Sequence, residues 1–155
     1  MRLTLIALGQ RMPAWVDAGV ADYAKRLPRE LGFSLIELRP APRGQGRPPA
    51  QLLADEARRI DEAAGDAEIV ALDERGEAWT TRALADRLAR WRDEQARIAL
   101  VIGSADGLDA GLRARARARV ALSAMTLPHG LCRVLAVEQL YRASSLLAGH
   151  PYHRE

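Results

Sequence analysis

The sequence predicts an α/β fold in which a mostly parallel β-sheet carries helices on both faces. Short apolar segments suited to β-strands alternate with longer segments of helical periodicity along the 155 residues. Two of the apolar segments, 2–8 and 99–102, are aliphatic enough for strands that are buried on both sides. This alternation predicts parallel pairing with helices over both faces. The length fits one domain, which we expect to span residues 1–155.

The first third of the chain is expected to form two strands, a helix and a loop. After the strand at 2–8, Pro13 suits the first position of a helix. One face of that helix is apolar at i, i+4, i+7 and i+11, namely at Val16, Val20, Tyr23 and Leu27. Residues 33–38 form the second strand. Four prolines, two glycines and three arginines mark 39–49 as a loop.

The middle of the chain predicts two helices around a short strand. The first helix covers about 50–64 and has an apolar face made of Leu53, Ala57, Ile60 and Ala64. Residues 68–72 form the strand. Thr80 or Thr81 can cap the second helix, whose apolar residues recur at i, i+4 and i+7, at Leu84, Leu88 and Trp91.

The last third continues the alternation. The strand at 99–102 is followed by a glycine-containing turn at 103–109, a short arginine-rich helix and a fifth strand at 120–122. A final helix is expected from 131 to about 147.

Composition and cysteine use indicate a cytoplasmic protein without a membrane span. No apolar run approaches the roughly 18 residues that a transmembrane helix needs. The first residues lack the long apolar core and cleavage site of a signal peptide. Cys132 is the single cysteine, which excludes an intrachain disulfide and fits a reducing compartment. A buried packing role suits it better than a nucleophilic one.

The basic residues are gathered in two parts of the chain. The net charge is only +3, but 39–49 carries three arginines and no acid. Residues 111–155 carry seven arginines against Glu138 and Glu155. Such gathering indicates an anionic partner, RNA or DNA. The alternative is a codon bias of the genome, because Lys25 is the only lysine among 23 basic residues.

Three loops follow strands in a region where α/β sheets bind ligands, at the carboxyl ends. They come after Leu72, Ile102 and Leu122. Gly103 and Gly107 can serve to let a ligand approach the backbone closely. The alternative is that they only form a tight turn between strand and helix. The loop matches neither G-x-G-x-x-G nor a Walker motif, which disfavours dinucleotides and nucleoside triphosphates. Residues 122–127 can enclose an adenine between aliphatic side chains and backbone polar groups, or simply connect strand and helix.

The chain ends in a segment rich in residues that handle phosphates, protons and bases. Arg154 suits phosphate contacts, His150 and His153 can transfer protons near neutral pH, and Tyr152 can stack on a base. The alternative is a tail that only docks on a neighbouring element. These two histidines and His129 lack the spacing of a zinc site, so we expect no metal.

Three motifs closely resemble the ribosomal RNA large subunit methyltransferase H family. They are Leu122-Ser-Ala-Met-Thr-Leu-Pro-His129, Val137-Glu-Gln-Leu-Tyr-Arg-Ala143 and Gly149-His-Pro-Tyr-His-Arg-Glu155. The opening residues 2–12 and the turn at 72–76 are similar too, so the resemblance covers essentially the whole chain. It implies a SPOUT methyltransferase fold with a C-terminal trefoil knot, which periodicity does not predict.

The resemblance also implies an activity and its partners. Members of this family use S-adenosylmethionine to methylate N3 of a pseudouridine in the helix 69 loop of 23S rRNA, in the assembled 70S ribosome. They act as homodimers, with neither DNA nor membrane as a partner. The rival from another class is a non-catalytic ribosome-binding or assembly factor. A second rival is a methyltransferase acting on another RNA, such as tRNA.

Site residues are carried over from the family's motifs. The implied cofactor pocket comprises Leu72, Gly103, Leu122, Ser123, Ala124, Met125, Thr126 and Leu127. His153 is the first candidate for proton handling; Arg154 and Arg142 are candidate cations, and Tyr152 is placed to stack on the base or to position the tail. One departure is Ser104-Ala105-Asp106, where the family has glycine, proline and glutamate. We expect the loop to keep its fold.

Overall fold

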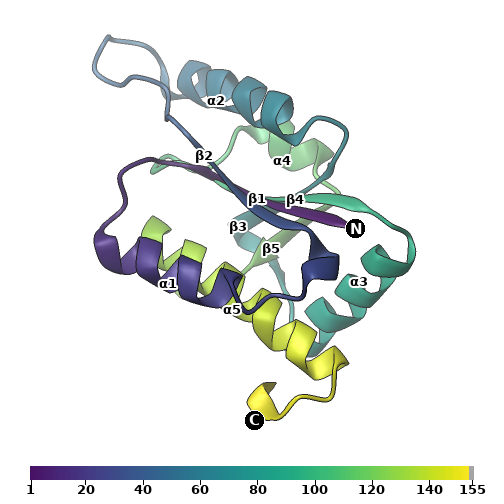
Figure 1. The fold of residues 1–155 in the computed structure, drawn as a ribbon. Helices are drawn as coiled ribbons and strands as arrows, with labels where there is room; N and C mark the ends of the chain where they lie inside the picture. Colours follow the sequence, from purple (N-terminus) through teal and green to yellow (C-terminus); the bar gives the residue numbers. More distant parts are fainter. Residues whose placement is uncertain (154–155) are drawn as a thin grey trace.

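A computed structural model describes residues 1–153 and confirms the α/β architecture. Five strands form one parallel sheet in the order β2-β1-β4-β3-β5 (Figure 1). The strands are β1 (Arg2–Leu8), β2 (Phe33–Leu38), β3 (Glu68–Ala78), β4 (Arg97–Ile102) and β5 (Ala118–Ala121). All five expected strands are present, and their carboxyl ends lie at one edge of the sheet.

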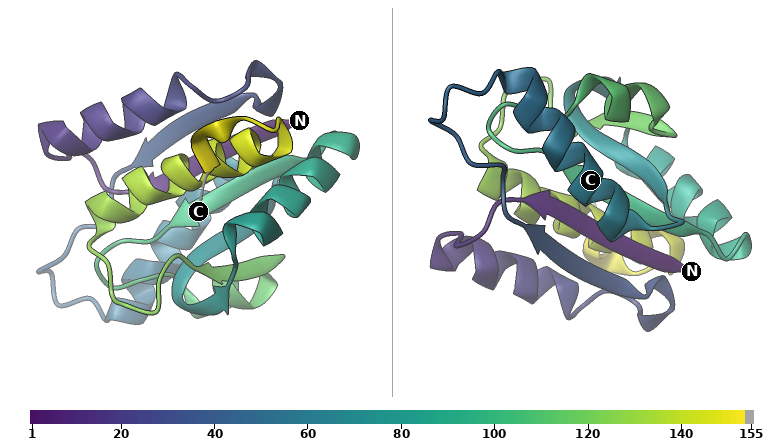
Figure 2. Two further views of the ribbon diagram at one scale, coloured as in Figure 1. Left: turned by 90° about the horizontal axis from the view of Figure 1, so that it is seen from below. Right: turned by 90° about the horizontal axis from the view of Figure 1, so that it is seen from above.

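Helices cover both faces of this sheet, as predicted. The helices are α1 (Ala14–Ala24), α2 (Pro49–Ala64), α3 (Thr81–Asp93), α4 (Ala110–Arg115) and α5 (His129–Leu147). Short 3-10 turns lie at Arg29–Leu31 and Pro151–His153. Figure 2 shows α1, α3 and α5 over one face and α2 and α4 over the other. Among residues 1–153, no helix combines the length and apolar composition needed to cross a bilayer.

Each face of the sheet has its own hydrophobic core. Val16, Leu88 and Leu140 pack from α1, α3 and α5 against β-strand side chains on one face. Ile60 and Leu112 pack from α2 and α4 against the other face. β1 and β4 contribute to both cores, which explains why these strands are apolar on both sides.

The structure corrects one expected residue on α2 and decides between the two expected caps of α3. On α2 the buried residue of the first turn is Leu52, whereas Leu53 is only half-buried and lines a cavity. The prediction of Leu53 for the core face was therefore wrong by one position. On α3 the capping residue is Thr80, whose Oγ1 accepts a hydrogen bond of 3.1 Å from the backbone N–H of Ala83.

β3 is six residues longer than expected, because it pairs with β5 in two segments. Val70–Leu72 pairs with Ala118–Val120, the register then shifts, and Glu77 and Ala78 pair with Val120 and Ala121. Gly76 makes this close approach of β3 to β5 at the register shift possible. A Cβ at Gly76 would lie 2.5 Å from the backbone nitrogen of Val120, where no side chain fits.

Candidate functional site

A cavity of about 650 Å³ opens at the carboxyl ends of β3, β4 and β5. The three loops that were predicted to follow the carboxyl ends of these strands form its wall. Seven of the eight residues implied for the cofactor pocket line it, namely Leu72, Gly103, Leu122, Ser123, Met125, Thr126 and Leu127. Ala124 is exposed and is not among the lining residues. A cavity of this size is typical of a small-molecule site.

The loop after β4 forms a tight turn between Gly103 and Gly107. The Gly107 N–H donates to the Ser104 carbonyl at 2.9 Å, and Gly107 has a φ of +85°. A Cβ at Gly103 would lie 2.4 Å from the Gly107 carbonyl oxygen. Gly103 therefore allows the loop to close on its own backbone. This geometry supports the tight-turn alternative for both glycines, while leaving the cavity side of the loop open.

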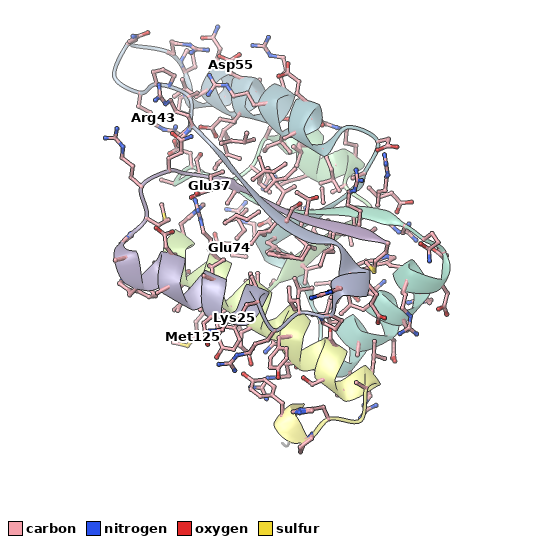
Figure 3. All side chains as sticks on the ribbon, viewed as in Figure 1. Lys25, Glu37, Arg43, Asp55, Glu74 and Met125 are labelled. Carbon is pink, nitrogen blue, oxygen red and sulfur yellow. The ribbon has the colours of Figure 1, made fainter. Side chains whose placement is uncertain are left out.

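Arg43 ties the 39–49 loop to the turn after β4. Its guanidinium donates to Asp106 Oδ2 at 2.7 Å and to Ser104 Oγ at 2.9 Å. It also donates to Glu56 Oε1 on α2 at 2.9 Å, and Ser104 Oγ donates to the other oxygen of that carboxylate at 2.7 Å. Ser104 and Asp106, two of the three positions that depart from the family pattern, therefore hold the turn in place. Figure 3 shows Arg43 leaving the loop beside α2.

His129 contacts the same turn from the first residue of α5. Its Nδ1 lies 2.9 Å from the Gly103 carbonyl oxygen, and its Nε2 accepts from Arg133 Nε at 2.9 Å. Burial lowers the pKa of His129 below its usual value, and the neighbouring Arg133 cation lowers it further. His129 is therefore a neutral imidazole in the cavity wall at neutral pH.

A buried carboxylate oxygen in the wall is without a hydrogen-bond partner. Asp73 Oδ1 accepts from the backbone N–H of Arg75 at 3.0 Å. Asp73 Oδ2 has no hydrogen bond within residues 1–153 and lies 3.7 Å from Arg113 Nη1. Because an unsatisfied buried acceptor is costly, this oxygen fits a ligand that brings a hydroxyl or ammonium donor.

The segment 122–127 presents both apolar and polar groups to the cavity. Ser123 Oγ accepts from the backbone N–H of Met125 at 2.9 Å, which shapes the turn. Met125 lines the cavity and yet is 77% exposed. Cys132 also lines the cavity, and partial burial raises the pKa of its thiol. A raised pKa keeps this thiol protonated, which supports the packing role over the nucleophilic one.

The proposed catalytic residues Arg142 and Tyr152 lie away from this cavity within one chain. Arg142 is 13 residues after His129 on α5, a rise of about 20 Å. Its guanidinium is paired with Glu138 Oε1 at 2.7 Å. The Tyr152 hydroxyl donates to the same oxygen at 3.2 Å, and its ring lies 4.5 Å from that of Tyr141. The tail thus docks on its own helix, at the end of α5 opposite to the cavity (Figure 1).

The Tyr152 hydroxyl is suited to donate a hydrogen bond and is not a phenolate base. Burial raises the pKa of its hydroxyl, and the neighbouring Tyr23 and Glu138 raise it further. It is therefore protonated at neutral pH. His153 has its backbone in the 3-10 turn at the tail, and its side chain lies outside the described part of the structure, as does the whole of Arg154.

Several residues of this region escape detection in the sequence. Glu138, which is 8% exposed, joins Arg142 and Tyr152, and its spacing of four residues from Arg142 is a signal that could have identified the pair. Arg43 and Glu56 are 13 positions apart and carried no such signal. Among residues 1–153, no group of three or more histidines, cysteines, aspartates or glutamates is arranged to hold a metal.

Solved structures share this fold. A probable methyltransferase from Bordetella pertussis Tohama I aligns with a TM-score of 0.58 at 21% identity, over 92% of this chain and 95% of that one. TrmJ from Z. mobilis aligns with a TM-score of 0.54 at 16% identity, over 94% of this chain and 70% of that one. At these identities the similarity concerns the fold alone.

Sequence comparisons show a much closer relationship. A family model described as "Predicted SPOUT methyltransferase" matches residues 1–153. The ribosomal RNA large subunit methyltransferase H of Laribacter hongkongensis is 53% identical over the full length of both chains. The protein of that name from Ralstonia nicotianae is 51% identical over 99% of both chains. The chain therefore belongs to the SPOUT methyltransferases and, within them, to the ribosomal RNA large subunit methyltransferase H family.

Proposed function

We propose that this protein transfers a methyl group from S-adenosylmethionine to N3 of a pseudouridine in 23S rRNA, in the helix 69 loop of the assembled ribosome. The observation that carries the proposal is the cavity at the carboxyl ends of β3, β4 and β5, in a chain that matches its family over its whole length. A ribosomal substrate implies action in the cytoplasm.

The cavity suits S-adenosylmethionine in both its apolar and its polar parts. Leu72, Leu122 and Leu127 supply aliphatic surface for an adenine ring. Asp73 Oδ2, which accepts no hydrogen bond within residues 1–153, suits a ribose hydroxyl or the amino group of the methionine part. The turn at 103–107 lines the cavity, and apart from Ser104 and Asp106 it contains only glycine and alanine, which leave room for a ligand.

The chain's own residues must align and activate the acceptor. When bound, the cofactor supplies an electrophilic methyl group on a sulfonium, which is transferred by in-line displacement. N3 of the acceptor loses its proton to become a good nucleophile, and we assign the handling of that proton to His153. Arg142 and Arg154 stabilise the resulting anionic base or hold phosphate. Tyr152 stacks on the base or donates its hydroxyl proton to a hydrogen bond.

The distance between cavity and tail supports a site to which a second copy of the chain contributes. Within one chain they lie at opposite ends of α5, so a single copy does not form a complete site. We therefore propose a homodimer in which the tail of one protomer reaches the cavity of its partner. Trp15 on α1 and Leu147 on α5 are large apolar side chains exposed at 58% and 40%, which supports a contact over this helical layer.

The arginines differ in how freely they can meet rRNA phosphates. Arg43 is engaged by Glu56 and Asp106, and Arg47 is ion-paired with Asp55 on α2. Arg39, Arg75 and Arg119 are exposed and have no carboxylate partner within residues 1–153. We propose that these three contribute to rRNA binding. Arg75 lines the cavity itself, which places it close to an acceptor base.

The experiment that tests this function combines labelling with mapping. Purified protein is incubated with labelled S-adenosylmethionine and 70S ribosomes that lack the modification, and the label is located by nuclease digestion and mass spectrometry. We expect one methyl group on a helix 69 pseudouridine. The variant H153A should lose turnover while its cofactor affinity stays intact, whereas H150A, in the same tail, serves as the matched control.

Each contrary result has a distinct meaning. Cofactor binding without ribosomal label, but with label on free tRNA, would establish a different RNA substrate. Ribosome binding without any cofactor binding would contradict the enzymatic function and favour an assembly factor. Unchanged turnover of H153A would remove this histidine from the mechanism.

A further inference from the structure

Arg133 is the most deeply buried charged side chain of the described structure. It lies on α5 with 1% exposure, and no part of the proposed reaction uses it. Each branch of its guanidinium has its own acceptor. Nε donates to His129 Nε2 at 2.9 Å, Nη1 to Glu37 Oε2 on β2 at 2.6 Å, and Nη2 to the Gly9 carbonyl after β1 at 2.6 Å. Burying a permanent cation is costly, and three acceptors with good geometry offset that cost.

This arrangement determines the protonation state of His129. An arginine has donors only, so His129 Nε2 must be a bare acceptor. The ring proton therefore lies on Nδ1, from which it donates to the Gly103 carbonyl at 2.9 Å. The lowered pKa of His129 agrees with a neutral ring, because burial and the Arg133 cation both disfavour a second proton.

Glycine at position 9 leaves room for the side chains of Arg133 and His129. A Cβ at Gly9 would lie 3.0 Å from Arg133 Nη2 and 3.5 Å from His129 Nε2. The Gly9 N–H donates to the carbonyl of Leu38 at the end of β2 at 2.8 Å. Arg133 thus joins the carboxyl ends of β1 and β2 to α5, and His129 extends the connection to the end of β4. Figure 3 shows Glu37 on β2, at the start of this chain of hydrogen bonds.

We propose that His129 is a positioning residue for cofactor binding, held by Arg133 as the Nδ1–H tautomer so that it anchors the Gly103 carbonyl. The anchor presents the turn at 103–107 to the cavity in one conformation before a ligand arrives, which reduces the ordering cost of binding. Arg133 acts through His129 and touches no ligand. This inference rests on the proposed use of S-adenosylmethionine.

Two substitutions of His129 separate the two hydrogen bonds. In H129N the amide nitrogen takes the place of Nδ1 and retains the donor toward Gly103. In H129Q the longer side chain places its amide near the former Nε2 and retains only the partner for Arg133. Calorimetric titration with S-adenosylmethionine should show affinity within about threefold of wild type for H129N and at least about tenfold weaker for H129Q. Thermal unfolding of both variants checks that they are folded.

A second measurement reads the tautomer directly in the wild-type protein. Nitrogen-15 NMR of the histidine side chains distinguishes a protonated Nδ1 from a protonated Nε2 and from the cation. We expect a protonated Nδ1 and a bare Nε2 for His129 at pH 7. A protonated Nε2 or an imidazolium would overturn the inference, whether or not the two variants fold.

The outcomes distinguish a failure of this inference from a failure of the proposed function on which it rests. If the wild-type protein binds S-adenosylmethionine and both variants bind it equally well, His129 is not a positioning residue and the proposed function stands. If H129N loses affinity as strongly as H129Q, the anchor at Gly103 is not what the histidine contributes. If the wild-type protein binds no S-adenosylmethionine, the proposed function fails and the inference fails with it.

Discussion

A few side chains hold the turn between Gly103 and Gly107 from two sides. His129 anchors the Gly103 carbonyl from α5, while Arg43 binds Ser104 and Asp106 from the 39–49 loop. Arg43 reaches Glu56, a carboxylate that is 2% exposed, and is one of three groups that donate to it. The departure from the family's loop sequence is thus accommodated by polar contacts with residues far away in the chain.

Removal of Arg43 should loosen this turn. We expect R43M to lower the free energy of unfolding by about 1–2 kcal/mol, because Glu56 keeps two donors and Arg43 is itself 35% exposed. Affinity for S-adenosylmethionine should fall with it. R47M is the matched control, since Arg47 leaves the same loop but pairs with Asp55 on α2. Urea denaturation and calorimetry give both quantities, and equal effects of the two variants would contradict the prediction.

His129 should make the stability depend on pH below neutrality. Its pKa is lowered in the folded protein, so between that value and the usual 6.5 the unfolded chain binds more protons. The contribution of His129 to the free energy of unfolding is therefore fully present above pH 6.5. It is lost as the pH falls through the pKa of His129 in the folded protein. Denaturation curves between pH 7.5 and 5 should show this loss for the wild type and a smaller one for H129N. Identical slopes would assign the pH dependence to other groups.

Among the elements, the paired strands β3 and β5 both contribute residues to the cavity wall, including Leu72 and Val120. β3 continues past the expected end at Leu72, and its second segment pairs with β5 in a shifted register. This extension was not predictable from 73–78, because the residues Asp73-Glu74-Arg75-Gly76 are typical of a turn. The pairing partner, 43 residues later in the chain for Glu77 and Val120, stabilises an extended conformation that local preferences disfavour.

Position 76 should tolerate no side chain, because β5 approaches the backbone of β3 closely there. We expect G76A to lower the free energy of unfolding by about 3 kcal/mol, at the upper end of overpacking costs, because the contacts within 2.7 Å are backbone atoms of Arg119 and Val120. E77A, the exposed neighbour on β3, should change it by less than about 0.5 kcal/mol. Urea denaturation measures both. A neutral G76A would show that the two strands can move apart.

Most other elements were predictable because their signals are local. The stripe at Val16 and Val20 and the repeat at Leu88 and Trp91 correctly identified the buried faces of α1 and α3. Thr80 was one of two alternatives for the cap of α3, and the hydrogen bond to Ala83 distinguishes it from Thr81. The misplaced Leu53 on α2 has a physical reason as well. The cavity lies next to that helix, so an apolar residue there lines open space instead of the core.

At the scale of the whole molecule, the cavity and the chemically rich tail lie far apart in one protomer. α5 separates them, and Tyr152 is docked on Tyr141 and Glu138 of the same helix. The proposed reaction needs both parts within reach of one acceptor base. Dimerisation is the simplest arrangement that supplies them, because each protomer has one cavity and one tail to exchange.

Complementation between two inactive variants tests this arrangement. G103V should block the cavity, and R142A should disable the tail-bearing end of α5. When they are mixed after partial unfolding and refolding, half of the dimers combine one variant of each kind. One of their two sites is then intact, so we expect about one quarter of wild-type activity from the mixture. Persistent inactivity, with dimers verified by light scattering, would place cavity and tail of the active site in the same protomer.

The amino-acid sequence is enough to predict the alternation of strands and helices, the parallel sheet and the three loops that meet at the cavity. These follow from side-chain periodicity and from the rule that parallel strands end at one edge. The trefoil knot stays a prediction from the family resemblance. The strand order is seen only in the folded chain, as are the contact between Arg133 and Gly9 across 124 positions and the separation of tail and cavity. Such contacts depend on the packing of the whole chain, because a local pattern carries no information about which distant segment it will meet.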